Sequence, residues 1–389
     1  MEIKKRVEEI FEEIVAIRRD FHMNPELSQH EIRTQAKIMS YLKSWGIECE
    51  ACAGTGVVGT IRGREGKTVG IRADIDALPI KEKCNLPHCS KNYGVMHACG
   101  HDAHAAVLLG AAKILKEMEK DLKGNVKLFF QPAEETVGGA LRMVKEGCMK
   151  NPDVDYVIGL HVQPYVEAGM VELKYGKLNA ASDEMKITVK GRHAHGAYPD
   201  KGIDAIMIAG HVITALQSLV SRNISPLNSA VLTLGKISGG VKENVIADEV
   251  IISGILRTLD DDTRKFAKQK IYEIVLNVAK AFGGEGRADF VEGYDALINN
   301  DEVVDVIKDT AENKLGKEKI IFKEFPSLGV EDFSYFADQC KGAFFHLGCG
   351  NKEKGITAPI HNEYFDIDEE CLKTGIYLQV ENVLALLNK

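Results

Sequence analysis

The sequence predicts an α/β fold in which a mostly parallel, mixed sheet is flanked by helices and interrupted by an inserted, ferredoxin-like α+β domain. Three observations support this expectation. The chain has 389 residues, which suits two domains better than one. Strand-like apolar runs alternate with helical stretches up to about residue 180, a pattern typical of a parallel sheet covered on both faces. From about Ser182 the order becomes strand-helix-strand-strand-helix-strand, which is that of a small two-layer unit.

The first part of the chain, residues 1–182, is expected to begin the larger domain. It opens with a charged amphipathic helix that ends at about Phe21. Further along, apolar runs predict buried strands, and the stretches between them predict helices. The clearer strands are expected at Thr68–Ile75, Asn125–Phe130 and Tyr156–Val162, and the clearer helices at 104–119 and 138–147.

The middle part, residues 183–294, is expected to form the inserted domain. The last part, residues 295–389, returns to helices and short strands and ends in a helix from about Asp368 to Leu387. This last part contains a candidate metal ligand, so we expect it to rejoin the first domain. Within the middle part, strands are expected at Glu184–Lys190, Ala230–Ile237, Val245–Leu259 and Arg287–Val291, and helices at Asp204–Arg222 and Asp262–Phe282.

Composition narrows the possible partners and location. A net charge of −8 and a pI near 5.9 argue against a nucleic-acid or anionic-membrane partner. No apolar run approaches the roughly 18–20 residues of a membrane span, and the first residues lack the apolar core of a signal peptide. Nine cysteines without an export signal favour a reducing, cytoplasmic location. Cys49 and Cys52 are expected to be free thiols, because no second pair follows at zinc-ribbon spacing.

The segment from Met96 to His104 is the strongest indication of a site. It contains three histidines, a cysteine and an aspartate, which bind divalent metals or tune the groups that do. Cys99 and His101 are two residues apart, so an extended strand end or loop would direct both side chains at one ion. A helix follows, with Asp102 placed to be its N-cap. We expect a metal site here; the alternative is a loop of ordinary histidines and a buried cysteine.

A metal site needs three or four ligands, so others must come from elsewhere in the chain. Glu134 and Glu135 follow an apolar strand, and one of them can bind metal while the other moves protons. His161 is expected at the end of another apolar strand, and His361 lies near the C-terminus. Each of these residues alone is a weak indication, but together they place metal-binding side chains at successive strand ends.

These motifs resemble the aminoacylase/carboxypeptidase family of two-metal hydrolases. The most similar branch contains the amidohydrolases, among them hippurate hydrolases, N-acetyldiaminopimelate deacetylases and auxin-conjugate hydrolases. The resemblance covers nearly the whole chain in order and implies the fold of two-metal exopeptidases. The matching segments are residues 18–22 with 25–28, 72–79, 96–104, 131–135, 159–161, 191–199 and 331–333.

The resemblance implies a role for each candidate in the larger domain. Glu134 is implied as the general base, while the ligand that bridges the two metals stays open. Asp76 is implied as the carboxylate that orients a ligand or the base, with Asp74 as its rival. The implied metal ligands are Cys99, His101, Glu135, His161 and His361.

In the inserted domain, the resemblance implies that His195 stabilises a tetrahedral oxyanion and that Asn244 helps to bind one end of the substrate. Arg257 could pair with a substrate carboxylate, or it could lie on a solvated strand face. The domain itself is expected to act as a lid and to form the contact of a homodimer.

The expected activity is metal-dependent hydrolysis of an N-acyl amino acid, a small molecule, to an amino acid and a carboxylic acid. Two divalent ions about 3.5–4 Å apart can activate a water molecule and polarise the amide carbonyl. A thiolate ligand favours zinc, cobalt or nickel over magnesium, and manganese stays open. The alternatives are a metallocarboxypeptidase or dipeptidase on the same scaffold, or a binding module without turnover. No nucleic acid or membrane is expected as a partner.

Overall fold

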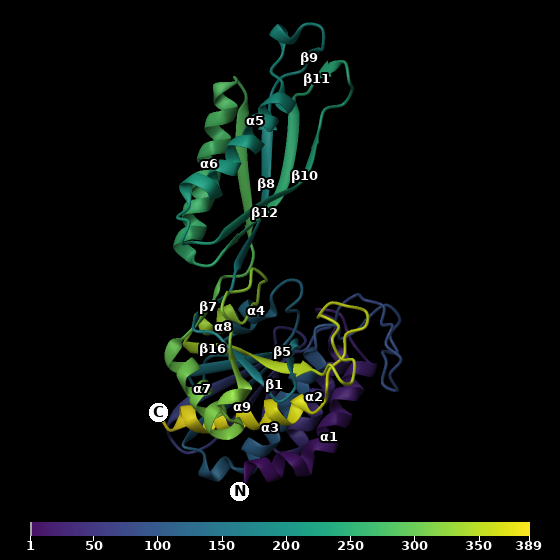
Figure 1. The fold of residues 1–389 in the computed structure, drawn as a ribbon, viewed down its shortest axis with the longest axis vertical. Coiled ribbons are helices and arrows are strands. Elements are labelled where there is room, and N and C mark those ends of the chain that lie inside the picture. The colour runs from purple at the N-terminus through teal and green to yellow at the C-terminus, as the bar shows by residue number, and fades with distance from the viewer. Residues whose placement is uncertain (1) are drawn as a thin grey trace. The chain divides into compact units, whose positions relative to one another are not determined.

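The computed structural model describes residues 2–389, and the chain folds into two compact units (Figure 1). The first unit contains the chain up to Gly176 together with Ile298–Phe325 and Asp332–Lys389. The second unit contains Lys177–Leu297 and the short segment Pro326–Glu331. Sequence patterning gave boundaries at about residues 182 and 295 and no sign that this short segment joins the second unit.

An eight-stranded mixed sheet forms the centre of the first unit. In sheet order its strands are β1 (Glu48–Cys52), β2 (Gly56–Arg62), β4 (Gly124–Gln131), β3 (Lys67–Asp74), β5 (Tyr156–Glu167), β16 (Lys341–Gly350), β6 (Val171–Leu173) and β15 (Ile320–Phe322). The four central strands β4, β3, β5 and β16 are parallel, whereas β1, β2 and β6 add antiparallel pairs. This arrangement confirms the predicted fold class.

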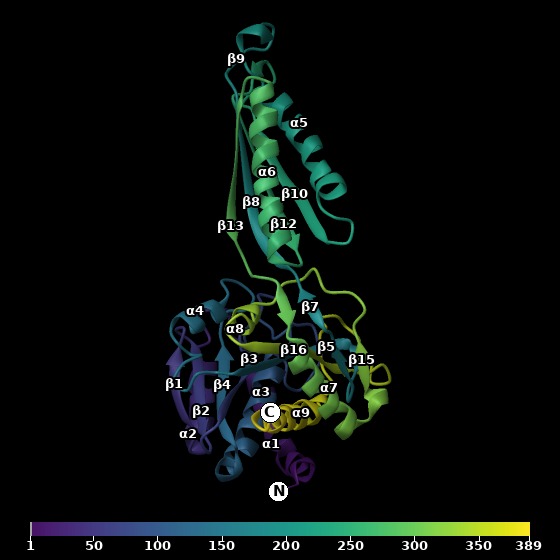
Figure 2. The same ribbon diagram turned by 90° about the vertical axis from the view of Figure 1, so that its left-hand side faces the viewer.

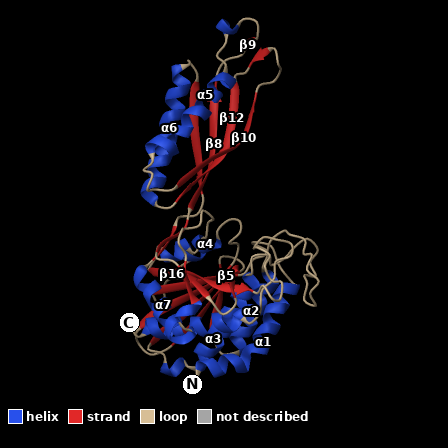
Figure 3. Ribbon diagram, in the orientation of Figure 1, coloured by secondary structure: helices blue, strands red, loops and turns tan. Residues whose placement is uncertain are grey.

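Helices cover both faces of this sheet (Figure 3). On one face α1 (Ile3–Met23), α3 (His101–Glu117) and α9 (Cys371–Leu387) pack against one another. Gly110 of α3 lies where they meet, because a Cβ atom there would come within 2.6 Å of Ile376. On the other face Phe129 stacks on Phe336 with ring centroids 5.1 Å apart. The other helices of this unit are α2 (Ile32–Ser44), α4 (Gly139–Lys145), α7 (Asp301–Leu315) and α8 (Ser334–Ala337).

Strand register brings several predicted site residues to one edge of the sheet. Asp74, the last residue of β3, lies opposite Gln131, the last residue of β4. On the other side of β3, Arg72 lies opposite Gly159 of β5, and this register puts His161 level with Asp74. The prediction that His161 ends its strand was wrong, because β5 continues to Glu167.

Helix α3 begins at His101, earlier than the sequence indicated, and its N-cap is Gly100. The prediction that Asp102 caps this helix was wrong. The Asp102 carboxylate is fully buried and lies 2.7 Å from Nε of Arg18 and 2.8 Å from Nδ1 of His22, both in α1. A buried carboxylate paired in this way joins α1 to the first turn of α3 and cannot also cap the helix.

The second unit is a two-layer α+β structure (Figure 2). Its four-stranded sheet has the order β10 (Ala230–Gly239), β12 (Glu249–Thr258), β8 (Ala181–Lys190) and β13 (Glu285–Glu292), and every neighbouring pair is antiparallel. Helices α5 (Ala205–Ser218) and α6 (Asp261–Ala281) pack on one face of it. This order is that of the predicted ferredoxin-like unit.

The strand expected at Val245–Leu259 is two strands. Its first part is β11 (Val245–Ile246), which pairs with β9 (Ala194–His195) in a separate two-stranded ribbon. The chain bends at Asp248, whose carbonyl accepts a hydrogen bond from Gly191 N, and β12 then enters the main sheet. The short elements of the chain are β7 (Gly176–Asn179), β14 (Leu297–Asn299), η1 (Glu119–Asp121), η2 (Pro199–Lys201), η3 (Leu219–Asn223) and η4 (Lys317–Lys319).

Within the described residues, one helix is long and apolar enough to cross a membrane by length and composition alone. It covers Ala205–Asn223, although no apolar run of this length was expected from the sequence. Ile208, Val212 and Leu216 on this helix are fully buried in the core of the second unit. These contacts make it one of the two helices that cover the four-stranded sheet.

Candidate metal centre

The turn before α3 brings Cys99 and His101 to the edge of the sheet. Gly100 between them has a φ of +87°, a conformation that glycine adopts without strain. A Cβ atom at Gly100 would also lie 2.3 Å from Cγ2 of Val162, so no larger residue fits. The two side chains therefore converge through a left-handed turn at a helix start, and not through the extended segment that their spacing suggested.

Five side chains from four separate segments converge at this point. The Sγ atom of Cys99 lies 3.3 Å from Nε2 of His161 and 3.3 Å from Nε2 of His361. Oε1 of Glu135 lies 3.1 Å from Nε2 of His361 and 4.0 Å from Nε2 of His101. Cys99 belongs to two groups of potential ligands, one with His101 and His161 and one with Glu135 and His361, each within 4.8 Å.

In His101 and His161, hydrogen bonds at Nδ1 leave the Nε2 atom available to bind a metal ion. His101 donates from Nδ1 to the backbone oxygen of Asp76 at 2.9 Å and to its Oδ1 at 3.1 Å. His161 donates from Nδ1 to the backbone oxygen of Val162 at 2.7 Å. Nε2 of His101 is buried and has no hydrogen-bond partner among residues 2–389. Ligand histidines are typically held in this way, with one nitrogen hydrogen-bonded and the other facing the metal.

The charges in the cluster also fit divalent cations. Burial and the carboxylates of Glu135 and Glu134 raise the pKa of the Cys99 thiol well above its ordinary value. Burial would lower the pKa of His101, but Asp74, Asp76 and Glu135 outweigh it and raise that pKa to about 10. These shifts reflect an excess of negative charge, which bound cations compensate while they stabilise the thiolate. The set of one thiolate, three imidazoles and a carboxylate therefore fits a pair of borderline divalent ions.

Asp76 and Asp74 have different neighbours. Oδ2 of Asp76 accepts hydrogen bonds from the Ser28 hydroxyl at 2.6 Å and from Glu135 N at 3.1 Å, while Oδ1 faces His101. Asp76 therefore contacts two of the predicted ligand residues. Asp74 instead pairs with Nη1 of Arg72 at 2.8 Å, although its Oδ2 also lies 3.6 Å from Nε2 of His101.

His104 was not assigned a role from the sequence, and the structure gives it one. Its Nδ1 donates to Oδ1 of Asp74 at 2.5 Å, and its Nε2 accepts from Val162 N at 2.9 Å. Both ring nitrogens are therefore used in joining β3, α3 and β5. Behind it, Arg72 is fully buried and also donates to Gln131 and Asp332. The sequence signals for this network were the charged residues inside an otherwise apolar strand and the family-like segments that contain its members.

Glu134 lies beside the predicted ligands. One of its oxygens is within 4.8 Å of both a His101 nitrogen and a Glu135 oxygen. Its side chain is buried, with 8% of the residue exposed. The geometry thus brings together all five predicted ligands, Glu134, Asp76 and Asp74 in the first unit.

The remaining candidates lie in the second unit. His195 is in β9, where it pairs with Val245, and Asn244 accepts a hydrogen bond from Gly196 N through its backbone oxygen. These two residues are therefore close together. Arg257 is near the opposite end of β12 from this ribbon, roughly 26 Å along the strand at about 3.3 Å per residue from Glu249. Its Nη1 is buried without a hydrogen-bond partner among residues 2–389, and burial lowers its pKa.

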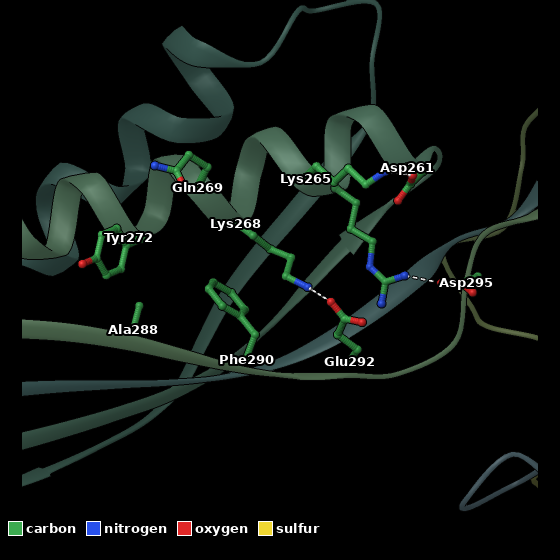
Figure 4. A pocket seen from close by; sticks show the side chains of 10 residues that line it. Asp261, Lys265, Lys268, Gln269, Tyr272, Ala288, Phe290, Glu292 and Asp295 are labelled. Atoms are coloured by element: carbon green, nitrogen blue, oxygen red, sulfur yellow. Dashed lines mark hydrogen bonds and ion pairs between the residues drawn. The ribbon is translucent and has the colours of Figure 1, made fainter.

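A pocket of about 510 Å³ in the second unit offers no alternative site (Figure 4). It lies between α6 and β13, where Phe290 and Tyr272 face it. Its cations already have partners, because Lys268 pairs with Glu292 and Arg264 pairs with Asp295. None of the clusters of potential metal ligands in residues 2–389 lies there.

The chain is similar to known proteins over most of its length. Residues 70–384 match the model of peptidase family M20/M25/M40. The chain is 41% identical to N-acetyl-L-cysteine deacetylase of Bacillus subtilis, over 97% of this chain and 88% of that protein. It is 40% identical to hippurate hydrolase of Campylobacter jejuni, over 92% and 93% of the two chains. It is 38% identical to thermostable carboxypeptidase 2 of Saccharolobus solfataricus, over 100% and 98%.

The fold also matches a solved structure over almost its whole length. YxeP of Bacillus subtilis, a dinuclear metal-binding peptidase of the M20 family, superposes with a TM-score of 0.86. The two chains are 31% identical, and the match covers 98% of this chain and 99% of that one.

Proposed function

The chain belongs to peptidase family M20/M25/M40, and from this premise we propose that it is a two-metal amidohydrolase that cleaves N-acyl amino acids. The products are a free amino acid and a carboxylic acid. One observation carries the proposal: the five side chains form two groups of potential ligand atoms that share Cys99, an arrangement that fits a dinuclear centre. The deacetylase and the hippurate hydrolase among its relatives are enzymes named for this type of substrate.

In this proposal Cys99, His101 and His161 hold one ion, and Cys99, Glu135 and His361 hold the other. Bound divalent ions make a water molecule more acidic and polarise the carbonyl of the amide. The thiolate favours zinc, cobalt or nickel, and manganese is the fourth candidate. Cys99 would then help to hold both ions, a point that the sequence left open.

The protein's own side chains move the proton and hold the geometry. Glu134 takes a proton from the attacking water and delivers it to the departing amine. Asp76 holds the ring of His101 and the backbone of Glu135, so that both ligands keep their orientation. Asp74 acts indirectly, through its contacts with Arg72 and His104.

In the second unit, His195 and Asn244 stay proposed contacts to the substrate. His195→Ala should lower kcat by about 10²–10³-fold without loss of metal, as expected for one oxyanion donor. His193, whose Nε2 lies 3.2 Å from Oδ1 of Asp248, is the matched control and should have little effect. We do not group Arg257 with them, because it lies far along β12; pairing with a substrate carboxylate stays a separate proposal for it.

We also propose a cytoplasmic homodimer that associates through the second unit. All nine cysteines, Cys49 and Cys52 included, are free thiols, which suits a reducing compartment. Light scattering of the purified chain measures the oligomeric state directly.

A carboxypeptidase or dipeptidase activity is the second candidate, because thermostable carboxypeptidase 2 is a relative over the full length. One experiment distinguishes the two candidates. It measures metal content and the turnover of acetyl-amino acids, benzoyl-amino acids and dipeptides with each of the four metals. Turnover of the acyl compounds well above the dipeptides supports the amidohydrolase. A preference for dipeptides supports the second candidate, and no turnover with both metals bound contradicts both.

A further inference from the structure

The turn that carries Glu134 and Glu135 has a conformation that its own sequence does not favour. Ala133 has a φ of +54°, in the left-handed region that residues with a Cβ atom rarely adopt. Such a residue persists only where the surroundings hold it. The backbone oxygen of Ala133 accepts hydrogen bonds from Gly138 N and Gly139 N, at 3.1 and 3.3 Å. These bonds fix one side of the residue and leave its N–H to be held by another group.

That group is Glu31. Its side chain has no solvent exposure, and its Oε1 accepts a hydrogen bond from Ala133 N at 2.9 Å. Its Oε2 accepts from the Thr55 hydroxyl at 2.5 Å. Glu31 lies 102 residues before Ala133 in the chain, so this contact depends entirely on the tertiary fold.

Glu31 is not needed for the helix that follows it. It occupies the N-cap position of α2, yet its side chain makes no capping hydrogen bond. Glu26 caps the helix instead, because its two carboxylate oxygens accept hydrogen bonds from Arg33 N at 3.0 Å and Thr34 N at 2.8 Å. The Glu31 carboxylate therefore serves Ala133 and Thr55 and does not cap α2.

We propose that Glu31 is a positioning residue for hydrolysis, which holds Ala133 in its left-handed conformation and so aims the carboxylate of Glu134. The inference rests on the proposed function, because it assigns Glu134 the role of the base. Asp76 holds Glu135 N at 3.1 Å, so the residues on both sides of Glu134 are fixed by buried carboxylates. Without Glu31 the turn relaxes at Ala133, while Asp76 keeps Glu135 at the metals.

The test compares Glu31→Met with two matched variants. Methionine fills the buried space with little change of volume but accepts no hydrogen bond from Ala133 N. A general base must lie within hydrogen-bond reach of its proton, and a shift of about 1 Å can cost about 10²-fold. We therefore expect kcat to fall by about 10–100-fold, with metal content and KM little changed. Glu31→Gln keeps an acceptor for Ala133 N and should retain most of the wild-type kcat.

Thr55→Val is the control for a purely structural effect. It removes the other hydrogen bond of the same carboxylate and leaves the bond to Ala133 N in place. It should lower the melting temperature but leave kcat near the wild-type value. A Glu31→Met enzyme with wild-type kcat overturns the proposal, as does activity lost only in proportion to metal, or an equal loss in Thr55→Val.

If Glu31→Met does not fold, Glu31→Leu takes its place, because leucine also accepts no hydrogen bond from Ala133 N. Wild-type kcat in Glu31→Leu then overturns the proposal. Ala133→Gly provides a second test when it is combined with the Glu31 variants. Glycine adopts a positive φ without strain, so this substitution should restore their activity. Failure of the proposed function gives a different result: the wild-type enzyme lacks amidohydrolase activity, or Glu134→Gln retains it.

Discussion

At the scale of single residues, Glu134 and Glu135 are neighbours in sequence that face different surroundings. Glu135 is held from its backbone by Asp76, and its Oε1 lies 3.1 Å from Nε2 of His361. Glu134 follows the left-handed Ala133 and lies beside His101 and Glu135. The backbone turn separates the two carboxylates, so that one can coordinate an ion while the other moves a proton.

Glu134→Gln should keep both metals and the fold but lose turnover. A glutamine amide can hydrogen-bond a water molecule but cannot accept its proton, and a general base typically contributes about 10²–10⁴-fold. Steady-state kinetics with metal analysis on the same sample measure both quantities. Activity within a few-fold of wild type would place the base elsewhere, and loss of metal would mean that Glu134 and Glu135 have exchanged roles.

Cys99→Ala should lose both ions, because its sulfur belongs to both groups of ligand atoms. His361→Ala removes a member of one group only, so this variant should retain most of the ion that the other group holds. The measurement is metal content by mass spectrometry after gel filtration, with activity assayed in parallel. Retention of both ions with normal turnover in Cys99→Ala would show that the thiolate is not a ligand, and equal loss in both variants would argue against a bridging role.

The residues proposed to bind metal could be singled out from the sequence, whereas most of the residues that hold them, apart from Asp76 and its rival Asp74, could not. Cysteine, histidine and paired glutamates carry chemistry that the sequence displays, so Cys99 and Glu134 could be singled out from local motifs. Glu31 gives no such signal, because its partner is a backbone N–H 102 residues away. Gly100 was given no role for a related reason: its φ of +87° and the close approach of Val162 are properties of the folded chain.

At the scale of elements, a second polar cluster joins neighbouring strands of the first unit's sheet. Glu172 of β6 accepts hydrogen bonds at Oε2 from Nδ1 of His346 in β16, at 2.6 Å, and from the Tyr165 hydroxyl of β5, at 2.8 Å. Lys323, just after β15, lies 3.3 Å from the same oxygen. One carboxylate thus connects four neighbouring strands.

This cluster should make part of the stability sensitive to acid. Burial would raise the pKa of Glu172, but the hydrogen bonds from His346 and Tyr165 outweigh it and lower that pKa to about 2, from an ordinary value of 4.5. A depressed pKa in the folded state stabilises the fold above pH 4.5, and this contribution is lost as the pH falls toward 2. The difference in unfolding free energy between wild type and Glu172→Gln should therefore shrink between pH 5 and pH 3. A difference independent of pH would contradict this assignment.

Elements with strong local patterns were predicted well, and those defined by pairing were not. Strands β3 and β4 lie within a residue of their expected ends, because both are apolar runs. The ten-residue strand β16 was not singled out, although it pairs with β5 at the centre of the sheet. The run Val245–Leu259 looked continuous, and only the pairing of β11 with β9 shows where it is divided.

At the scale of the whole molecule, each unit has a hydrophobic core of its own. The first core includes Ile376 of α9, and the second includes Leu216 of α5, both without solvent exposure. All five proposed metal ligands belong to the first unit. The stability of the two units should therefore depend on different conditions, since a ligand stabilises only the structure that binds it.

We accordingly expect the protein to unfold in two transitions, which calorimetry can resolve. Removal of metal by a chelator should lower the transition of the first unit and leave the other unchanged. Leu216→Ala should do the reverse, since truncation of a buried leucine costs about 2–5 kcal/mol in the core that contains it. Ile376→Ala is the matched variant in the first core and should lower the metal-dependent transition alone. A single transition that shifts equally with the chelator and with both substitutions would show that the two cores unfold as one cooperative unit.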